Sequence, residues 1–262
     1  MSTQRIPIAA LRKIRQYLKS ALIVPESEQF PIRQTEEAEP LTSIDDLSRL
    51  FDVGSLPTLT PSIKQGRWFI SVTNPGAALL KLPGLKLKTG FRLVGYLYRN
   101  GKDGSGVVWA VPEALSTIAQ LEKALSTSRN PPQPEGALAN FMNAIEGDQS
   151  WLSFVIASIL KRELLEFGAI GTGKSWEHHR LIDRLPVHVP MQWQTAPIQD
   201  FAPKVSVDGG SGTVRQITIQ FFTARSVDQG VVVFQHVDRY TTGNYCASGI
   251  DRAVAAIGQN RN

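Results

Sequence analysis

Four stretches of the chain repeat their apolar residues every three or four positions, which is the spacing of one face of a helix. They are residues 8–24, 113–126, 150–167 and 251–257. The first carries basic side chains on its other faces, and the third contains the most apolar window of the chain. The pattern therefore predicts a basic amphipathic helix near the N-terminus and a long buried helix at residues 150–167.

Other stretches are runs of β-branched and aromatic residues, some of them alternating with polar ones as in half-buried strands. Residues 91–98 and 107–111 predict one hairpin, and residues 217–222 and 230–237 predict a second. In both pairs the connecting segment contains residues that favour turns. A shorter strand-like run at residues 68–72 precedes the first hairpin.

Proline-containing segments divide these elements into modules. The sequence SRNPPQPEG contains three prolines and no large apolar residue, so we expect an exposed linker there. The predicted fold class is α+β, with two small modules, each an antiparallel β-hairpin sheet packed on helices. The expected divisions are a basic amphipathic helix at 1–25, an acidic proline-containing linker with a short helix at 26–61, a basic α+β module at 62–127, the linker at 128–136, and an α+β module around the central helix at 137–262.

The net charge of +5 is distributed unevenly along the 262 residues. Residues 1–25 carry five basic and no acidic side chains, residues 26–52 carry eight acidic and two basic ones, and residues 53–102 carry eight basic and no acidic ones. Blocks of like charge bear on partners and solubility, not on fold. The basic blocks therefore predict an acidic partner, an anionic membrane surface or a nucleic acid.

The cysteine content and the apolar windows indicate a cellular location. A single cysteine, Cys246, excludes an internal disulfide and any multi-cysteine metal cluster, which fits a reducing cytoplasm. The apolar windows are far shorter than the roughly 20 residues that cross a bilayer, and basic residues interrupt the N-terminal segment where a signal peptide is apolar. We therefore expect a cytoplasmic protein whose only route to a membrane is peripheral association.

Residues 168–175, GAIGTGKS, match the phosphate-binding pattern G-x-x-x-x-G-K-[ST]. In such a loop, Gly168 and Gly173 let backbone amides wrap a phosphate, while Lys174 and Ser175 contact the nucleotide phosphates and Mg²⁺. The context does not fit, because a charged helical segment precedes the loop where a buried strand is required. We expect a helix-ending turn here and keep nucleotide binding as an alternative.

Other catalytic patterns are not recognisable in the sequence. His178 and His179 are adjacent, so on a helix they point about 100° apart and cannot share one metal ion. No serine stands in a G-x-S-x-G nucleophile elbow. We therefore expect no metal, no cofactor and no enzymatic activity.

Basic residues are interleaved with aromatic ones in the region 64–102. Such a surface can hold single-stranded nucleic acid by stacking and phosphate contacts. In a hairpin, however, the aromatic side chains can all face the core and leave only solvated lysines. Non-specific nucleic-acid binding through this region is a second alternative.

The favoured function is that of a non-enzymatic accessory or assembly protein that binds an acidic protein partner or complex, or an anionic membrane surface. The residues expected at this contact lie in the N-terminal helix, in the basic region and after the glycine-rich turn. They are Arg12, Arg15, Lys19, Lys81, Lys86, Lys88, Arg92, Trp176, His178 and His179.

Overall fold

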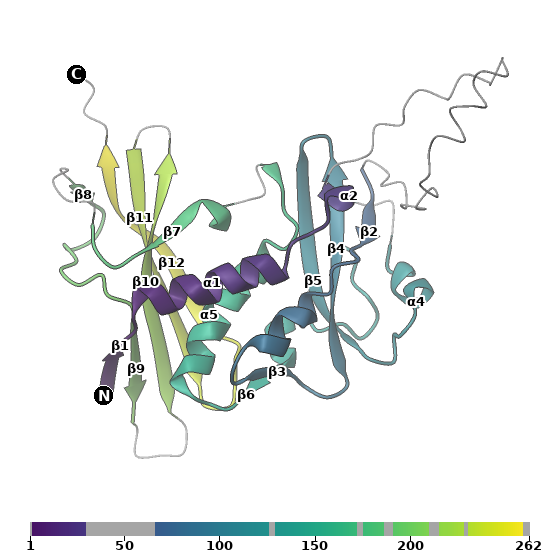
Figure 1. Cartoon of the computed structure of the whole chain (residues 1–262), viewed down its shortest axis with the longest axis horizontal. Coiled ribbons are helices and arrows are strands. Elements are labelled where there is room, and N and C mark those ends of the chain that lie inside the picture. Colours follow the sequence, from purple (N-terminus) through teal and green to yellow (C-terminus); the bar gives the residue numbers. More distant parts are fainter. Residues whose placement is uncertain are drawn as a thin grey trace, which may run out of the picture.

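A seven-stranded antiparallel sheet, curled into a half-barrel, dominates the computed structural model of the chain (Figure 1). Six strands follow the order β1–β9–β10–β11–β12–β8, and β7 pairs with β10 beside β9. The strands are β1 (Ser2–Arg5), β7 (His179–Ile182), β8 (Met191–Trp193), β9 (Lys204–Asp208), β10 (Gln216–Val227), β11 (Gly230–Thr241) and β12 (Ser248–Gly258). The structure describes residues 2–29, 66–125, 129–171, 175–185, 191–209, 215–227 and 230–258.

Two smaller sheets and several short helices complete the described part. One sheet contains β2 (Trp68–Ile70), β4 (Phe91–Asn100) and β5 (Asp103–Pro112), and β3 (Leu85–Leu87) pairs with β6 (Ile145–Gly147). The short helices are α2 (Glu26–Gln29), α4 (Ile118–Glu122) and the 3-10 helices η1 (Pro75–Lys81), η2 (Phe141–Ala144) and η4 (Trp176–His178).

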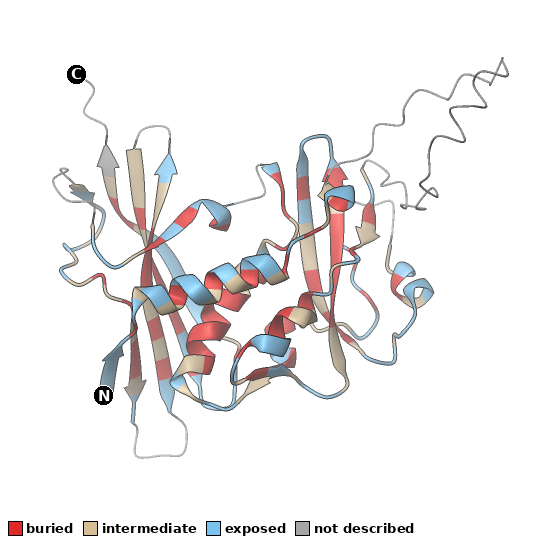
Figure 2. Cartoon of the chain, in the orientation of Figure 1, coloured by how far each residue is buried: buried red, intermediate tan, exposed pale blue. Residues whose placement is uncertain are grey.

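Two long helices, α1 (Ile8–Ala21) and α5 (Trp151–Leu165), lie between the large sheet and the β2–β4–β5 sheet (Figure 1). Ser150 caps α5 by accepting a hydrogen bond from the Ser153 amide at 3.2 Å. Figure 2 shows α5 as an almost continuously buried helix. A helix that is apolar on most of its circumference must be covered on several sides, and α5 packs on both β10 and β5.

The expectation of two small modules, each a hairpin sheet on helices, is wrong. Strand accounts for 40% of the described residues against 26% helix, and the second hairpin belongs to a seven-stranded sheet. A single core cluster joins Leu18 of α1, Leu97 of β4, Ile159 of α5 and Ile219 of β10. The two hairpins therefore share one buried helix, which the periodicity of either hairpin alone could not indicate.

Two helices expected from the sequence do not form as predicted. Residues 251–257 belong to β12, which pairs with residues 230–239 of β11. Buried backbone groups need hydrogen-bond partners, so the open edge of β11 recruits this segment despite its helical spacing. Of the expected helix at residues 113–126, positions 113–125 are described, and among them only α4 is helical, starting at a capping box formed by Thr117 and Gln120.

The remaining predicted elements agree with the structure. The N-terminal helix, the helix after Ser150 and both hairpins are confirmed, with longer strands than the patterns indicated. Most of the acidic linker and its short helix lie outside the described residues. Within the described ranges, no helix combines the length and apolarity needed to cross a membrane.

Candidate functional site

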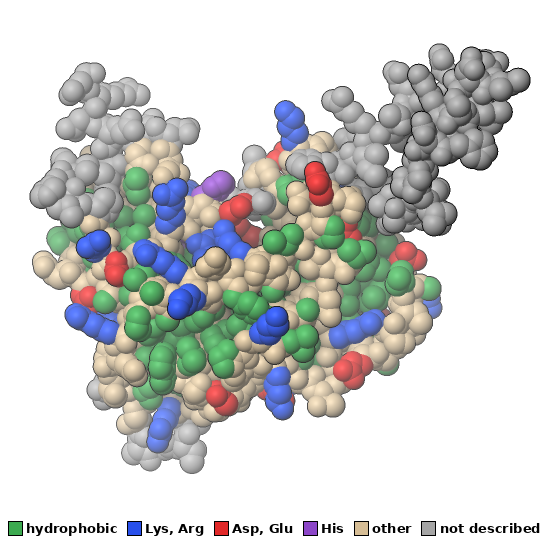
Figure 3. All heavy atoms as spheres, viewed as in Figure 1, with side chains coloured by type: hydrophobic (Ala, Val, Ile, Leu, Met, Phe, Trp, Pro, Cys, Tyr) green, Lys and Arg blue, Asp and Glu red, His purple; other side chains and the backbone are tan. Residues whose placement is uncertain are grey.

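A groove runs between α1 and β7 on the face where Lys and Arg side chains gather in Figure 3. We call it the α1–β7 groove. Its volume is about 450 Å³. It is lined by Arg12, Arg15, Gln16, Lys19, Glu177, His179, Arg180 and Leu181. Three of these side chains are exposed cations, and one is an exposed carboxylate.

The floor of the groove is held by arginines that cap the outer edge of β7. Arg12 Nη2 donates to the Leu181 carbonyl at 3.0 Å, and Arg15 Nη1 donates to the His179 carbonyl. An uncovered strand edge leaves backbone groups free to pair with another chain. These two side chains therefore satisfy the β7 edge and attach α1 to it.

Arg15 and Trp176 belong to the interior of the protein. Arg15 Nε pairs with Glu163 Oε1 at 2.8 Å, and its guanidinium lies 4.4 Å from the centre of the Trp176 ring. The same Glu163 oxygen accepts the Trp176 indole N–H at 2.7 Å. His179 is buried as well, while His178 is exposed. Of the residues expected at the partner contact, Arg15, Trp176 and His179 therefore support the groove from below.

Below the groove, a chain of hydrogen bonds crosses the concave face of the large sheet. Thr223 Oγ1 lies 2.7 Å from His179 Nδ1 and 2.7 Å from His236 Nε2. His236 Nδ1 lies 2.8 Å from Asp251 Oδ1, which also accepts from Arg162 at 2.6 Å. Side chains on β7, β10, β11 and β12 thus meet through strand register, although they are far apart in the sequence.

Burial has the largest effect on the pKa values of the groups in this series of hydrogen bonds. Burial, with a contribution from the charge of His236, lowers the pKa of His179 to about 4. Burial also lowers the pKa of His236 below its ordinary value. Burial opposes ionisation of Asp251, but hydrogen bonds from His236 and Arg162 outweigh it and hold its pKa below the usual range. At neutral pH the two histidines are neutral and Asp251 is charged.

The order hydroxyl, imidazole, carboxylate in Thr223–His236–Asp251 matches that of a nucleophile, its base and the orienting acid. Here the hydroxyl is fully buried and lies between two imidazole rings, so no reacting group can approach it. The network therefore links side chains of neighbouring strands inside the protein. Among the described residues, no group of three His, Cys, Asp or Glu side chains converges as a metal site requires.

Backbone amides at and just after the end of the glycine-rich segment bind a carboxylate of the protein itself. The amides of Ser175, Trp176 and Glu177 all donate to the Glu166 side chain. The segment follows α5 and leads into the three-residue helix η4, whereas a phosphate loop connects a strand to a full helix. Gly173 and Lys174 lie outside the described residues. A phosphate bound by the amides of Ser175, Trp176 and Glu177 would have to displace the carboxylate of Glu166.

Gly168 at the start of this segment adopts φ +61° and lies against Leu97 and Val24. The next two amides already donate within the protein, Ala169 to the Glu166 carbonyl and Ile170 to the Gly104 carbonyl at 3.0 Å. Gly168 therefore serves the helix-ending turn expected from the sequence.

The aromatic residues of the region 64–102 pack inward on both faces of the β2–β4–β5 sheet. Trp68 and Tyr96 are buried in one cluster, while Phe69 and Phe91 pack against the main core. Stacking of bases needs exposed aromatic faces. Trp68 and Tyr96 therefore offer no exposed face for stacking, while Phe69 and Phe91 are partly buried.

The basic residues of this region are dispersed. Lys86 pairs with Glu146 at 3.1 Å, Lys88 Nζ donates to the Asn143 carbonyl at 2.6 Å, and Lys81 is exposed on η1. Arg92 is half-buried, and its Nε and Nη2 have no hydrogen-bond partner in the described ranges. None of these four residues lines the α1–β7 groove.

Sequence reasoning missed the hydrogen-bond chain and the role of Arg180. The only available signal was the position of His236 inside a strand-like run, where every second residue faces inward. Its partner Asp251 was assigned to a helix, so the pairing could not be anticipated. The site is thus a cationic groove on a curled antiparallel sheet.

Comparison of the chain with family models, with curated proteins and with solved structures finds no match.

Proposed function

We propose that this protein is a non-enzymatic accessory protein that binds an acidic segment of a partner protein in the α1–β7 groove. The observation that carries the proposal is the groove itself, with exposed Arg12, Lys19 and Arg180 against the single carboxylate of Glu177. A concave site with an excess of one charge concentrates ligands of the opposite charge.

The burial of α1 favours a protein partner over a membrane. An interfacial helix must insert its apolar face into lipid. In α1 that face is occupied, since Leu11 and Leu18 are completely buried in the core. The exposed face of α1 is basic, so it supplies charge without an apolar surface to insert.

The test measures binding of a glutamate-rich peptide of about 20 residues to the full chain by fluorescence anisotropy. Reversing Lys19 and Arg180 (Lys19→Glu with Arg180→Glu) removes exposed cations that line the groove. We expect affinity to fall at least about tenfold, since losing even one favourable charge contact of about 1.4 kcal/mol changes affinity tenfold.

The matched control reverses two exposed cations near the β2–β4–β5 sheet, Lys123→Glu with Arg129→Glu, and changes the net charge equally. Equal losses in the two variants would show that only net charge matters, which would refute the groove as the site. Anionic vesicles are measured alongside the peptide. Binding to vesicles and not to peptide would overturn the choice of a protein partner.

A further inference from the structure

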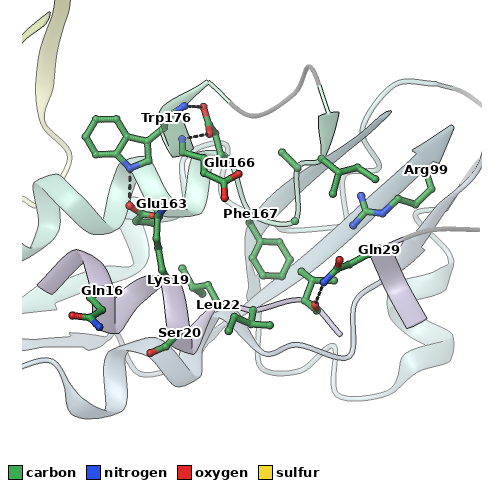
Figure 4. A pocket seen from close by; sticks show the side chains of 16 residues that line it. Gln16, Lys19, Ser20, Leu22, Gln29, Arg99, Glu163, Glu166, Phe167 and Trp176 are labelled. Atoms are coloured by element: carbon green, nitrogen blue, oxygen red, sulfur yellow. Dashed lines mark hydrogen bonds between the residues drawn. The ribbon is translucent and has the colours of Figure 1, made fainter. Parts of the chain in front are cut away.

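A second pocket, of about 460 Å³, opens beside the α1–β7 groove (Figure 4). Its walls come from the C-terminal half of α1, from α2, from the end of α5 and from the turn at residues 168–170. Its volume lies within the range of small-molecule sites. It shares Gln16, Lys19 and Glu177 with the groove but extends in the other direction, toward β4.

At its inner end the pocket reaches Arg99 of β4, whose side chain is completely buried. Arg99 Nε donates to the Glu28 carbonyl at 2.7 Å, and Nη1 donates to the Tyr98 carbonyl at 3.0 Å. Nη2 has no hydrogen-bond partner among the described residues. In Figure 4 the guanidinium points toward the side of the pocket where Phe167 lies.

The charge of Arg99 is not neutralised by a hydrogen-bonded carboxylate in the described part of the chain. Glu28, whose charge raises the pKa of Arg99, uses its carboxylate to accept from Ser71 Oγ at 2.7 Å and from the Val72 amide at 2.7 Å. Burial lowers the pKa of Arg99 to about 10, so the side chain remains protonated at neutral pH. A buried cation with an unused donor is costly unless an anion pairs with it.

The rest of the pocket determines what kind of anion fits. Leu22, Ile23, Val24, Phe167 and Ile170 line the pocket together with Arg99 and form its apolar wall. Within the described part of the chain, Nη2 is the one nitrogen of Arg99 without a partner, which suits a single carboxylate oxygen better than a phosphate with several oxygens to satisfy.

Three acidic residues at the other end of the pocket disfavour a ligand of high negative charge. Glu163 and Glu166 are engaged by internal donors, and Glu177 is exposed. A ligand with one charge at its inner tip avoids them, whereas a polyanion would be repelled.

We propose that this pocket binds a small monocarboxylate with a hydrocarbon body, its carboxylate on Arg99 Nη2 and its chain along the apolar wall. The site is independent of the acidic partner proposed for the groove. Arg180 lines the groove but not this pocket, so a failure of peptide binding leaves the monocarboxylate site standing.

The experiment titrates sodium octanoate into the full chain by isothermal titration calorimetry, with octanol and inorganic phosphate as comparison ligands. We expect saturable one-to-one binding of octanoate and at least tenfold weaker binding of octanol and of phosphate. Equal affinity for octanol would remove Arg99 from recognition, and preference for phosphate would overturn the ligand class. Absence of saturable octanoate binding would refute the proposal.

Two variants locate the site. Ile23→Glu places a carboxylate in the wall at a position that is 65% exposed, and Leu80→Glu is the matched control at an apolar position that is 85% exposed on η1. We expect octanoate affinity to fall at least tenfold in the first and to stay unchanged in the second. Arg99→Met is expected to abolish the preference for octanoate over octanol. If that variant fails to fold, Ile23→Glu alone decides, because unchanged octanoate affinity there would place the ligand elsewhere.

Discussion

At the scale of single residues, side chains of like charge on one helix have different roles. Arg15 and Lys19 both lie on α1, yet Arg15 is buried on Glu163 and Trp176 while Lys19 is exposed in the groove. The sequence identifies both as cations on a basic helix. Only the position of α5 and η4 decides that Arg15 faces inward, because its partners lie about 150 residues further along the chain.

The buried histidine His179 makes stability depend on pH. Its pKa is about 4 in the folded protein against an ordinary 6.5, so folding favours its neutral form. The stability that this group contributes is complete above pH 6.5 and is lost as the pH falls toward 4. Each pKa unit corresponds to about 1.4 kcal/mol, so we expect acidification from pH 7 to pH 4 to remove about 2–3 kcal/mol through this residue.

Urea unfolding at several pH values tests this expectation. In His179→Gln the side chain can still bond Thr223 but does not titrate. We therefore expect this variant to lose about 2–3 kcal/mol less unfolding free energy than the wild type between pH 7 and pH 4. His178→Gln, at the exposed neighbouring position, controls for the removal of one imidazole. If the unfolding free energies of the wild type and His179→Gln changed with pH in parallel, the assignment of this pH dependence to His179 would be contradicted.

At the scale of elements, the end of α5 meets the β4–β5 hairpin so closely that the hairpin needs glycines there. A Cβ on Gly95 would lie 2.2 Å from Phe167 Cε1, and a Cβ on Gly106 would lie 2.0 Å from the Phe167 carbonyl oxygen. Glycine in a strand marks such close approaches. The sequence shows these glycines in the expected hairpin, but the helix that requires them comes about 60 residues later.

Gly106→Ala is therefore expected to be destabilising. The added methyl group must displace the end of α5 or bend β5, and overpacking of this kind costs about 1–3 kcal/mol. Gly209→Ala is the control, since a Cβ there meets nothing within 4 Å and its backbone is not in the left-handed region. The free energy of unfolding from urea titration should fall in the first variant and change by less than about 0.5 kcal/mol in the second. Similar values would show that the α5–β5 contact is adaptable.

At the scale of the whole molecule, the shared core predicts one cooperative unfolding transition. Residues of α1, α5, β4, β5 and β10 belong to one cluster, so neither sheet retains its inner face if the other unfolds. Differential scanning calorimetry of the full chain should show a single peak whose calorimetric and van't Hoff enthalpies agree. Two resolved peaks would indicate that the segments on either side of residues 128–136 unfold independently, as the linker sequence suggested.

Local pattern was sufficient for the elements that fold around their own periodicity. The amphipathic spacing of α1, the continuous apolar surface of α5 with its Ser150 cap, and the two hairpins were all predictable, because these signals lie within about 20 residues of chain. The excess of basic residues in the N-terminal part was equally a property of the sequence alone.

Tertiary structure decided which strands pair and which charges face inward. The edge of β11 turned a helix-like segment into β12, and this pairing set Asp251 beside His236. Arg99 was one cation among several in a basic region until the fold buried it at the end of a pocket. The physical reason is the same in each case: burial and hydrogen-bond pairing depend on neighbours supplied by distant segments, and sequence periodicity reports only on neighbours along the chain.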